Sequence, residues 1–478
     1  MRPALPSFAS GVVPRAWLAA LGRPVDGAWL GAFRFLFGLL LAVSVLRFLA
    51  FGWVERLLVE PTFHFKYWGF EWVEALPGPA MRALFWVLFG AALATAVGFC
   101  FRLSAALLGS GFVYFQLIDV SNYLNHYYLA ALLVWLLCFS PAHRSWSVDA
   151  WIARRRAARR GAAAPPRFVA QGWLYLFRFQ IGLVYTFAGL AKAQADWLVH
   201  AQPLSIWLGA STDVPILGPL FAVRGVPLVM SWCGFLFDTT IVCWLLWRRT
   251  RSYAFAVVVL FHALTGLLLP IGMFPLIMIT AAMVFFEPDW PRRLLARFSR
   301  ARAAAPLSPA LAPAPLARGA RFALCLGAVY CGLQLVLPLR FLAYPGNVLW
   351  HEQGMRFSWR VMVRAKGGNT SFIVRHKATG QEWHVSPRAY LTGLQETEMS
   401  SQPDLILQLA HHIRRDFEAR GQGPVEVRVD SRVAFNGRRS APLIDPHRDL
   451  TTIRDGLAAR DWVLPAPRSR PTPTRPVL

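Results

Sequence analysis

Long apolar runs recur through most of the chain. They lie at about residues 29–50, 81–100, 104–119, 126–140, 173–192, 226–247, 253–270, 272–287 and 321–337. A helix needs about 20 mainly apolar residues to cross the hydrocarbon core of a bilayer, and the third, fourth and eighth runs are shorter than that. The pattern predicts an α-helical polytopic membrane protein with about nine transmembrane helices.

The final region follows a different pattern. Beyond Tyr344, short segments alternate apolar and polar residues between glycine-containing turns, which is typical of strands and hairpins. The predicted strands are 371–374, 382–385, 425–429 and 433–435. Apolar residues at helical spacing predict one helix over Pro403–Arg420. We therefore expect a C-terminal exported β-rich domain that contains one helix.

These patterns divide the chain into four parts. Residues 1–24 form an N-terminal cytoplasmic segment, and residues 25–340 form the transmembrane domain, which includes a cytoplasmic linker rich in Pro and Ala at about 303–316. The β-rich domain spans 341–462. The Pro- and Arg-rich tail, 463–478, is expected to be disordered.

Clusters of arginine set the expected orientation. The sequence RRRAARR at Arg154–Arg160, the sequence RRTR at Arg248–Arg251 and a third cluster at Arg292–Arg302 all lie between apolar runs. Short loops rich in Lys and Arg stay in the cytoplasm. The amino terminus is then cytoplasmic and the β-rich domain lies outside. Richness in Ala and Arg without organelle signals suggests a bacterium, so we expect the inner (plasma) membrane, with the C-terminal domain periplasmic or extracellular.

Composition supports a membrane protein and argues against other classes. Hydrophobic residues make up 56% of the chain, and the mean hydropathy is +0.41. Membrane topology explains the arginine clusters behind the net charge of +25, so nucleic acid is not an expected partner. The six cysteines lie within or at the ends of apolar runs and form no CxxC pair, so neither a disulfide framework nor a metal site is expected.

Three ionisable residues are expected at one depth near the outer face of the membrane. His126 opens its run, Lys192 closes an apolar stretch over Leu174–Leu190, and His262 lies about two turns before the outer end of its run. Each has a purely structural interpretation: a cap, a lysine that reaches the interface, or a hydrogen bond between helices. Together they favour a functional site, because ionisable groups inside membranes usually face a cavity or a partner.

Lys192 is the most informative of the three. Burial disfavours the charged amine, so this lysine is a candidate base. Asp196 lies four residues later and would favour the charged form if the helix continued through it, although a role at the helix end is the alternative. Asp119, Asn122, Asn125 and Asp238 are expected nearby. With Ala191 as its neighbour, Lys192 is expected to depend on burial alone to stay neutral.

Several motifs resemble the vitamin K-dependent gamma-glutamyl carboxylases and the bacterial proteins that share their horizontally transferred transmembrane domain. The resemblance extends from about Val25 to Asp449. Its motifs are FRFLFG (33–38), FRLSAAL (101–107), LNHYYL (124–129), WSVDAW (146–151), QIGLVYTFAGLAKAQADW (180–197), FH (261–262), IGMF (271–274), PDWPRRL (288–294) and FSWRVMV (357–363).

The resemblance implies an enzyme that couples two reactions. Reduced vitamin K is oxidised by oxygen to its epoxide, and a glutamate residue is carboxylated with carbon dioxide to gamma-carboxyglutamate. Lys192 matches the family lysine that deprotonates the quinol, and His126 matches the histidine assigned to proton removal from glutamate. His262 matches a histidine of the quinone pocket, where we also place Asn125 and Asp119. The expected partners are the bilayer, a lipid-soluble quinone and a glutamate-containing peptide, and no metal is implied.

Some positions depart from the family pattern. The vertebrate enzyme has two adjacent lysines where this chain has Ala191 and Lys192, and Phe357 replaces an aromatic hydroxyl. The chain ends sooner than the vertebrate proteins and lacks the cysteines of their disulfide. Two alternatives therefore stay open: a quinol-dependent oxygenase or epoxidase without glutamate carboxylation, and a non-catalytic membrane scaffold that binds quinone or lipid.

An aromatic and basic cluster follows the last apolar run. It comprises Trp350, His351, Arg356, Trp359 and Arg360. Arginine pairs well with carboxylate, so we predict that Arg356, Phe357, Trp359 and Arg360 bind the glutamate-containing substrate. An interfacial anchor of Trp and Arg is the alternative interpretation.

Overall fold

The computed structural model describes residues 15–215, 217–221, 223, 225–298 and 318–472. Seven of its helices are long and apolar enough to cross a membrane, and two apolar helices are shorter. The long ones are α2 (Ala28–Ala50), α3 (Gly78–Val97), α4 (Phe101–Ile118), α7 (Gln171–Lys192), α11 (Val226–Leu246), α12 (Arg251–Leu268) and α15 (Arg318–Leu339). The short ones are α5 (Asn125–Phe139) and α13 (Phe274–Ala282), the latter continued by the 3₁₀ turn η4 (Met283–Phe285). The polytopic helical fold is confirmed.

A close approach of backbone and side chain fixes the end of α3. Gly98 ends this helix in the left-handed conformation, and a Cβ atom there would lie 1.6 Å from Arg34 Nη1. Arg34, fully buried in α2, donates a hydrogen bond of 2.7 Å to the carbonyl of Trp146. The missing side chain of Gly98 therefore lets a buried arginine connect α2 to the loop before α6 (Val148–Arg159).

The C-terminal domain contains an antiparallel sheet in the order β4-β3-β5-β6. Its strands are β3 (Lys366–His376), β4 (Glu382–Val385), β5 (Val425–Phe435) and β6 (Ala441–Pro442). Alternate residues of β5 are buried, among them Val425, Val427 and Val429, and α18 (Pro403–Ala419) packs against this strand. Each fully buried valine stabilises the domain by about 1.5–3 kcal/mol, so this pattern specifies which face of the sheet meets the helix.

The structure corrects three details of this domain. The segments 425–429 and 433–435 form one strand, β5, because the polar residues between them stay paired with β3 along its whole length. Two further helices precede α18: the short α16 (Val348–His351) and α17 (Gly393–Met399), which begins at a capping box made by Thr392 and Gln395. The start of the tail, expected to be disordered, contacts the domain: Leu464 donates to the carbonyl of Leu443.

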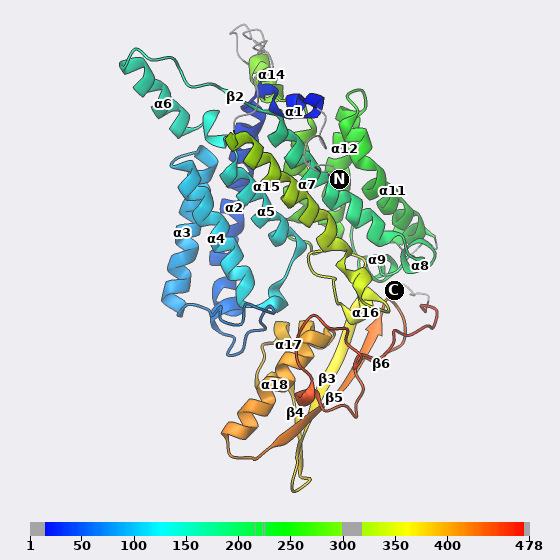
Figure 1. Cartoon of the computed structure of the whole chain (residues 1–478). Coiled ribbons are helices and arrows are strands. Elements are labelled where there is room, and N and C mark those ends of the chain that lie inside the picture. The colour runs from blue at the N-terminus through cyan, green and yellow to red at the C-terminus, as the bar shows by residue number, and fades with distance from the viewer. Residues whose placement is uncertain (1–14, 216, 222, 224, 299–317, 473–478) are drawn as a thin grey trace, which may run out of the picture.

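The C-terminal domain lies at one end of the helical bundle (Figure 1). Helices α6 and α14 (Trp290–Phe298), which carry two of the arginine clusters, lie at the opposite end. The short helix α16 (Val348–His351) lies where the chain passes from α15 into the sheet. The expected linker at 303–316 and most of the N-terminal segment lie outside the described residues.

Candidate functional site

An apolar cavity of about 300 Å³ lies beside the ends of α7, α11 and α12 nearest to the C-terminal domain. Its polar lining includes Tyr185, Lys192, Asp238 and His262, whereas most of the other lining side chains are apolar. Ligand pockets in proteins typically measure about 300–1,000 Å³ and combine apolar walls with a few polar groups. The cavity therefore has the size and character of a site for a small, largely apolar molecule.

Lys192 forms a buried ion pair inside this cavity. Its Nζ atom lies 2.7 Å from Asp238 Oδ2, and both side chains are more than 90% buried. The amine also donates to the carbonyls of Ala188 at 3.3 Å and Val361 at 3.5 Å. The expectation that burial alone governs this amine is therefore wrong, because α11 supplies a carboxylate partner.

Asp196, the other carboxylate considered for this lysine, is engaged elsewhere. Helix α7 ends at Lys192, and Asp196 lies in the separate short helix α8 (Ala195–Leu198). Its carboxylate accepts hydrogen bonds from Arg438 at 2.6 and 2.8 Å and from Asn436 at 3.0 Å. Burial raises the pKa of Asp196, but these hydrogen bonds outweigh burial and leave the pKa lowered. Asp196 therefore joins the membrane domain to the C-terminal domain.

Tyr185 and His262 form the second polar pair of the cavity. The hydroxyl of Tyr185 lies 3.0 Å from Nε2 of His262. Nδ1 of His262 is buried and has no hydrogen-bond partner in the described residues. Sequence reasoning missed Tyr185, although it lies seven residues, or two helical turns, before Lys192 and hence on the same face of α7.

His126 lies outside this cavity. The ring of Phe274 lies between the two histidines: its centroid is 6.2 Å from that of His126 and 6.0 Å from that of His262. Phe274 lines the cavity, whereas His126 is buried behind it and contacts the ring of Tyr127 edge-on. The three ionisable residues expected at one depth are thus close together, but Lys192 and His262 share a cavity that His126 does not line.

A second, more polar cavity of about 240 Å³ adjoins the first. Its charged and amide lining residues are Asn125, Glu352, Arg356, Arg360, Arg364, Glu398 and Gln402. Met362 lines both cavities, and the adjacent Val361 lines only the apolar one. Val361 and Met362 therefore lie between the apolar cavity that contains Lys192 and the polar cavity that is rich in arginine.

The segment that separates the cavities has an unusual backbone. Phe357, Trp359 and Met362 have φ angles of 60°, 57° and 53°, in the left-handed region that non-glycine residues seldom occupy. Packing holds the first two in place. Phe357 contacts Tyr123 and Tyr128, and Trp359 stacks on Tyr128 with ring centroids 4.9 Å apart. Neither Phe357 nor Trp359 lines either of these two cavities, so we interpret both as supports of the segment that separates them.

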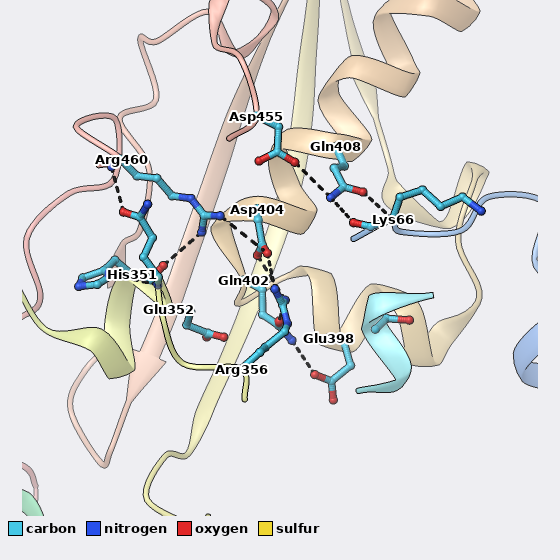
Figure 2. Close-up of polar contacts among 12 residues, drawn as sticks. Lys66, His351, Glu352, Arg356, Glu398, Gln402, Asp404, Gln408, Asp455 and Arg460 are labelled. Atoms are coloured by element: carbon cyan, nitrogen blue, oxygen red, sulfur yellow. Dashed lines mark hydrogen bonds and ion pairs between the residues drawn. The ribbon is translucent and has the colours of Figure 1, made fainter. Parts of the chain in front are cut away.

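Arg356, predicted to bind substrate, is already paired (Figure 2). Its guanidinium lies 2.5 Å from Asp404 Oδ2 and donates to Gln402 Oε1 at 2.5 Å. Burial raises the pKa of Asp404, but Arg356 and Arg460 outweigh it and hold the pKa well below its ordinary value. Gln402 in turn donates to Glu398 at 2.8 Å. Arg356 therefore anchors a network within the C-terminal domain.

Arg360, the other arginine predicted to bind substrate, packs against an aromatic ring. Its guanidinium lies over the ring of Phe341, 4.1 Å from the centroid, and its Nε is buried without a hydrogen-bond partner among the described residues. Burial lowers its pKa to about 10.

Asp119 and Asn125 are separated from the apolar cavity. Asp119 accepts hydrogen bonds from Ser121 at 2.8 Å and from Gln395 at 2.7 Å, so it contacts the C-terminal domain through α17. Asn125 lines the polar cavity. These two candidates for the quinone pocket thus lie elsewhere.

Comparison with known families agrees with this architecture. A family model described as the HTTM domain matches residues 22–290, which is more than half of the chain. A second, described as the vitamin K-dependent gamma-carboxylase lumenal domain, matches residues 319–469. The chain belongs to the vitamin K-dependent gamma-carboxylase family. No solved structure matches the chain.

Family membership identifies the helical part and the C-terminal part of the chain. The protein is a multi-pass membrane protein, and its antiparallel sheet belongs to an extracytoplasmic C-terminal domain. The apolar cavity lies where these two matched regions meet, because Val361 and Met362 of the second close against helices of the first.

The apolar cavity also fits the quinol that the family uses. Its largely apolar walls suit the fused ring, and the Lys192–Asp238 pair can accept a proton from a hydroxyl group. The unpartnered Nδ1 of His262 offers a further polar contact for the second ring oxygen.

Proposed function

We propose that this protein is a membrane carboxylase that couples quinol oxidation to glutamate carboxylation. Reduced vitamin K or a related quinol, oxygen, carbon dioxide and a glutamate residue are consumed; the quinone epoxide, gamma-carboxyglutamate and water are formed. The observation that carries this proposal is the adjacency of the two cavities at Met362. An apolar chamber with a proton acceptor and a polar chamber with free positive charge are what the two half-reactions need.

The proton acceptor in this proposal is the pair of Lys192 and Asp238 acting together. In the ion pair the amine of Lys192 carries a proton and the carboxylate of Asp238 is ionised. A proton from the quinol is accepted by the carboxylate, so that both groups are then protonated. The carboxylate also fixes the direction of the amine, 2.7 Å away, so that Nζ stays inside the cavity. When the ionised quinol reacts with oxygen, it supplies the base for the second half-reaction.

Exclusion of water is the second requirement of this proposal. A strong base formed in the apolar cavity would be consumed by water before it reached glutamate. Helices α7, α11 and α12 supply much of the apolar lining of the cavity, and Val361 and Met362 line it on the side of the C-terminal domain. A lipid-soluble quinol can enter from the bilayer, whereas a peptide must approach through the extracytoplasmic domain.

His126 keeps a proposed role next to the polar cavity. The preceding residue, Asn125, lines that cavity, and His126 itself is buried behind Phe274. We assign it to the carboxylation half-reaction, as its match to the family histidine implies. We also place the protein in a bacterial inner membrane with a cytoplasmic amino terminus, because the arginine-rich helices α6 and α14 lie opposite the C-terminal domain.

A product assay tests the proposal. Purified protein receives vitamin K hydroquinone, oxygen, labelled bicarbonate and a glutamate-containing peptide, and both epoxide and peptide-bound label are measured. We expect both products from the natural chain and neither from Lys192→Ala. Lys377→Ala, a half-exposed lysine of the C-terminal domain, is the matched control and should keep full activity.

The possible outcomes separate the three functions. Epoxide without peptide-bound label identifies a quinol-dependent oxygenase, and the absence of both products favours a binding scaffold. Removing Lys192 leaves Asp238 as an unpaired buried charge, so the variant needs a folding control. The double variant Lys192→Met with Asp238→Asn removes both charges and should unfold near the natural temperature while making no epoxide. Epoxide formation by that folded double variant would contradict the assignment of the base.

A further inference from the structure

Three arginines line the polar cavity, but two of them are neutralised by the protein itself. Arg356 pairs with Asp404, and Arg364 pairs with Glu352, which also accepts a bond of 2.8 Å from Lys366. Burial raises the pKa of Glu352, but these cations outweigh it and leave the pKa lowered, so the carboxylate stays ionised beside them. These charges are satisfied before any ligand arrives.

Arg360 is the exception. Within residues 318–472 and the other described ranges, its guanidinium has no carboxylate within 4.0 Å, and its recorded contact is the ring of Phe341. Its buried Nε has no acceptor. Glu398 lines the same cavity, yet its recorded hydrogen bond comes from Gln402. A buried donor without an acceptor is costly, so a native protein that retains one requires a reason, such as a functional role of the donor or a bound ion.

We propose that Arg360 is the carboxylate-binding residue of the polar cavity and that it holds the side-chain carboxylate of an acidic residue in a peptide. This inference rests on the proposed function for the identity of the peptide. The planar fork of a guanidinium forms two parallel hydrogen bonds with a carboxylate. A cavity of about 240 Å³ accommodates one side chain, while the rest of the peptide stays outside.

The chemistry of carboxylation explains why a free cation is needed there. The strong base from quinol and oxygen removes a proton from the γ-carbon, the C–H bond breaks, and its electron pair remains on a fragment that already bears a carboxylate. The γ-carbanion delocalises the second negative charge onto those carboxylate oxygens, and the pair then forms the new C–C bond with carbon dioxide. A guanidinium paired with that carboxylate stabilises the dianion more than the substrate, which is the condition for catalysis.

The sequence predicted Arg356 and Arg360 equally, and the structure separates them. Arg356 holds Asp404 and Gln402, so its replacement removes a link of the C-terminal domain. Arg360 forms no ion pair with the residues that the structure describes, so its replacement by glutamine should lower the unfolding temperature much less than replacement of Arg356. This difference allows a binding test that does not depend on stability.

The decisive experiment measures peptide binding without quinol. A fluorescent peptide with one glutamate is titrated with the full-length protein in lipid nanodiscs, and the same peptide with glutamine is the ligand control. We expect Arg360→Gln to weaken binding of the glutamate peptide about tenfold or more, the loss typical of a charge-assisted pair. Arg360→Lys should retain part of the affinity. Arg388→Gln, an exposed arginine paired with Glu396, is the matched protein control and should bind normally.

Two results would overturn the assignment. One is unchanged affinity of a folded Arg360→Gln variant for the glutamate peptide; the other is an equal loss for the glutamate and glutamine peptides. The proposed function fails separately. If the natural protein binds the glutamate peptide through Arg360 but forms no labelled product, the site stands and carboxylation is excluded. If the natural protein carboxylates the peptide while Arg360→Gln binds it normally, only the site is wrong.

Discussion

Lys192 Nζ on α7 lies 2.7 Å from Asp238 Oδ2 on α11, and both side chains are buried where the membrane helices meet the C-terminal domain. Neither charge could remain there alone. A low-dielectric environment makes an isolated buried ion costly, whereas a hydrogen-bonded pair offsets much of that cost. The pair therefore joins two helices and also keeps an ionisable amine inside an apolar cavity.

A double-mutant cycle should reveal this dependence in the unfolding temperature. Asp238→Asn leaves the lysine charge unpaired, and breaking one side of a buried pair typically costs about 3–5 kcal/mol. The double variant Lys192→Met with Asp238→Asn should recover most of the loss. Thermal unfolding in detergent, followed by tryptophan fluorescence, provides the measurement. If the single and double variants unfold at the same temperature, the two residues are not coupled.

Tyr185 should affect quinol binding and leave peptide binding unchanged. Tyr185→Phe removes the hydroxyl that lies 3.0 Å from His262 Nε2, so the histidine loses its recorded hydrogen bond and its orientation. A lost hydrogen bond of this kind costs about 0.5–1.5 kcal/mol, so we expect KM for the quinol to rise a few-fold while peptide affinity stays constant. Tyr253→Phe, an exposed tyrosine of α12, is the control. An equal rise in both KM values would place Tyr185 outside the quinol site.

Met362 should control how tightly the two half-reactions are coupled. Because Met362 lines both cavities, Met362→Ala should remove part of the wall between them and admit water to the apolar cavity. We expect more epoxide for each gamma-carboxyglutamate formed, measured as a ratio in one assay. Met362→Leu conserves the volume and should keep the natural ratio. A ratio that does not change in the alanine variant would show that the wall lies elsewhere.

The sequence was sufficient to predict the helices but not to predict which side chains of different helices lie against one another. Apolar runs specified every membrane helix to within a few residues, because length and composition govern insertion into a bilayer. The apolar runs also predicted how deep each residue lies in the membrane, and these depths placed Lys192 near His262. The apolar runs did not predict the rotation of each helix about its axis, which determines the neighbours that its side chains face. Asp238 points at Lys192 and Phe274 screens His126 only because of how α11 and α13 pack.

The same limit applies to the C-terminal domain. Arg356 and Arg360 lie four residues apart in one arginine-rich segment, and their spacing carries no sign of different roles. What separates them is Asp404, at the start of a helix 48 residues after Arg356, which the fold brings against one guanidinium and not the other. Contacts that distant in sequence depend on tertiary packing, so a single sequence cannot assign them.

Glu398 should destabilise the protein at neutral pH. Burial raises its pKa above the ordinary value of 4.5, although nearby arginines and Gln402 oppose the shift. A carboxyl group whose pKa is raised in the folded state contributes stability below its unfolded pKa and loses that contribution as the pH rises through the folded pKa. Glu398→Gln should therefore raise the unfolding temperature at pH 8 and have little effect at pH 4. A lower unfolding temperature at pH 8 would show that the carboxylate is stabilising.

Asp404 should behave in the opposite way. Burial disfavours its charge, but Arg356 and Arg460 outweigh burial and hold its pKa below the ordinary value of 3.8. Its contribution to stability is then fully present above about pH 4 and is lost as the pH falls toward the lowered pKa. Asp404→Asn should cost about 3–5 kcal/mol at pH 7, because it leaves the buried Arg356 without its charge partner.

The pH dependence supplies the control for Asp404. The difference in unfolding temperature between the natural chain and Asp404→Asn should be large at pH 7 and should shrink as the pH falls below about 4, because the unfolded chain then takes up a proton at this carboxylate while the folded chain does not. Asp430→Asn, an exposed position in the adjacent strand β5, should show no such difference at any pH. A difference independent of pH would mean that Asp404 stabilises the domain by packing rather than by charge.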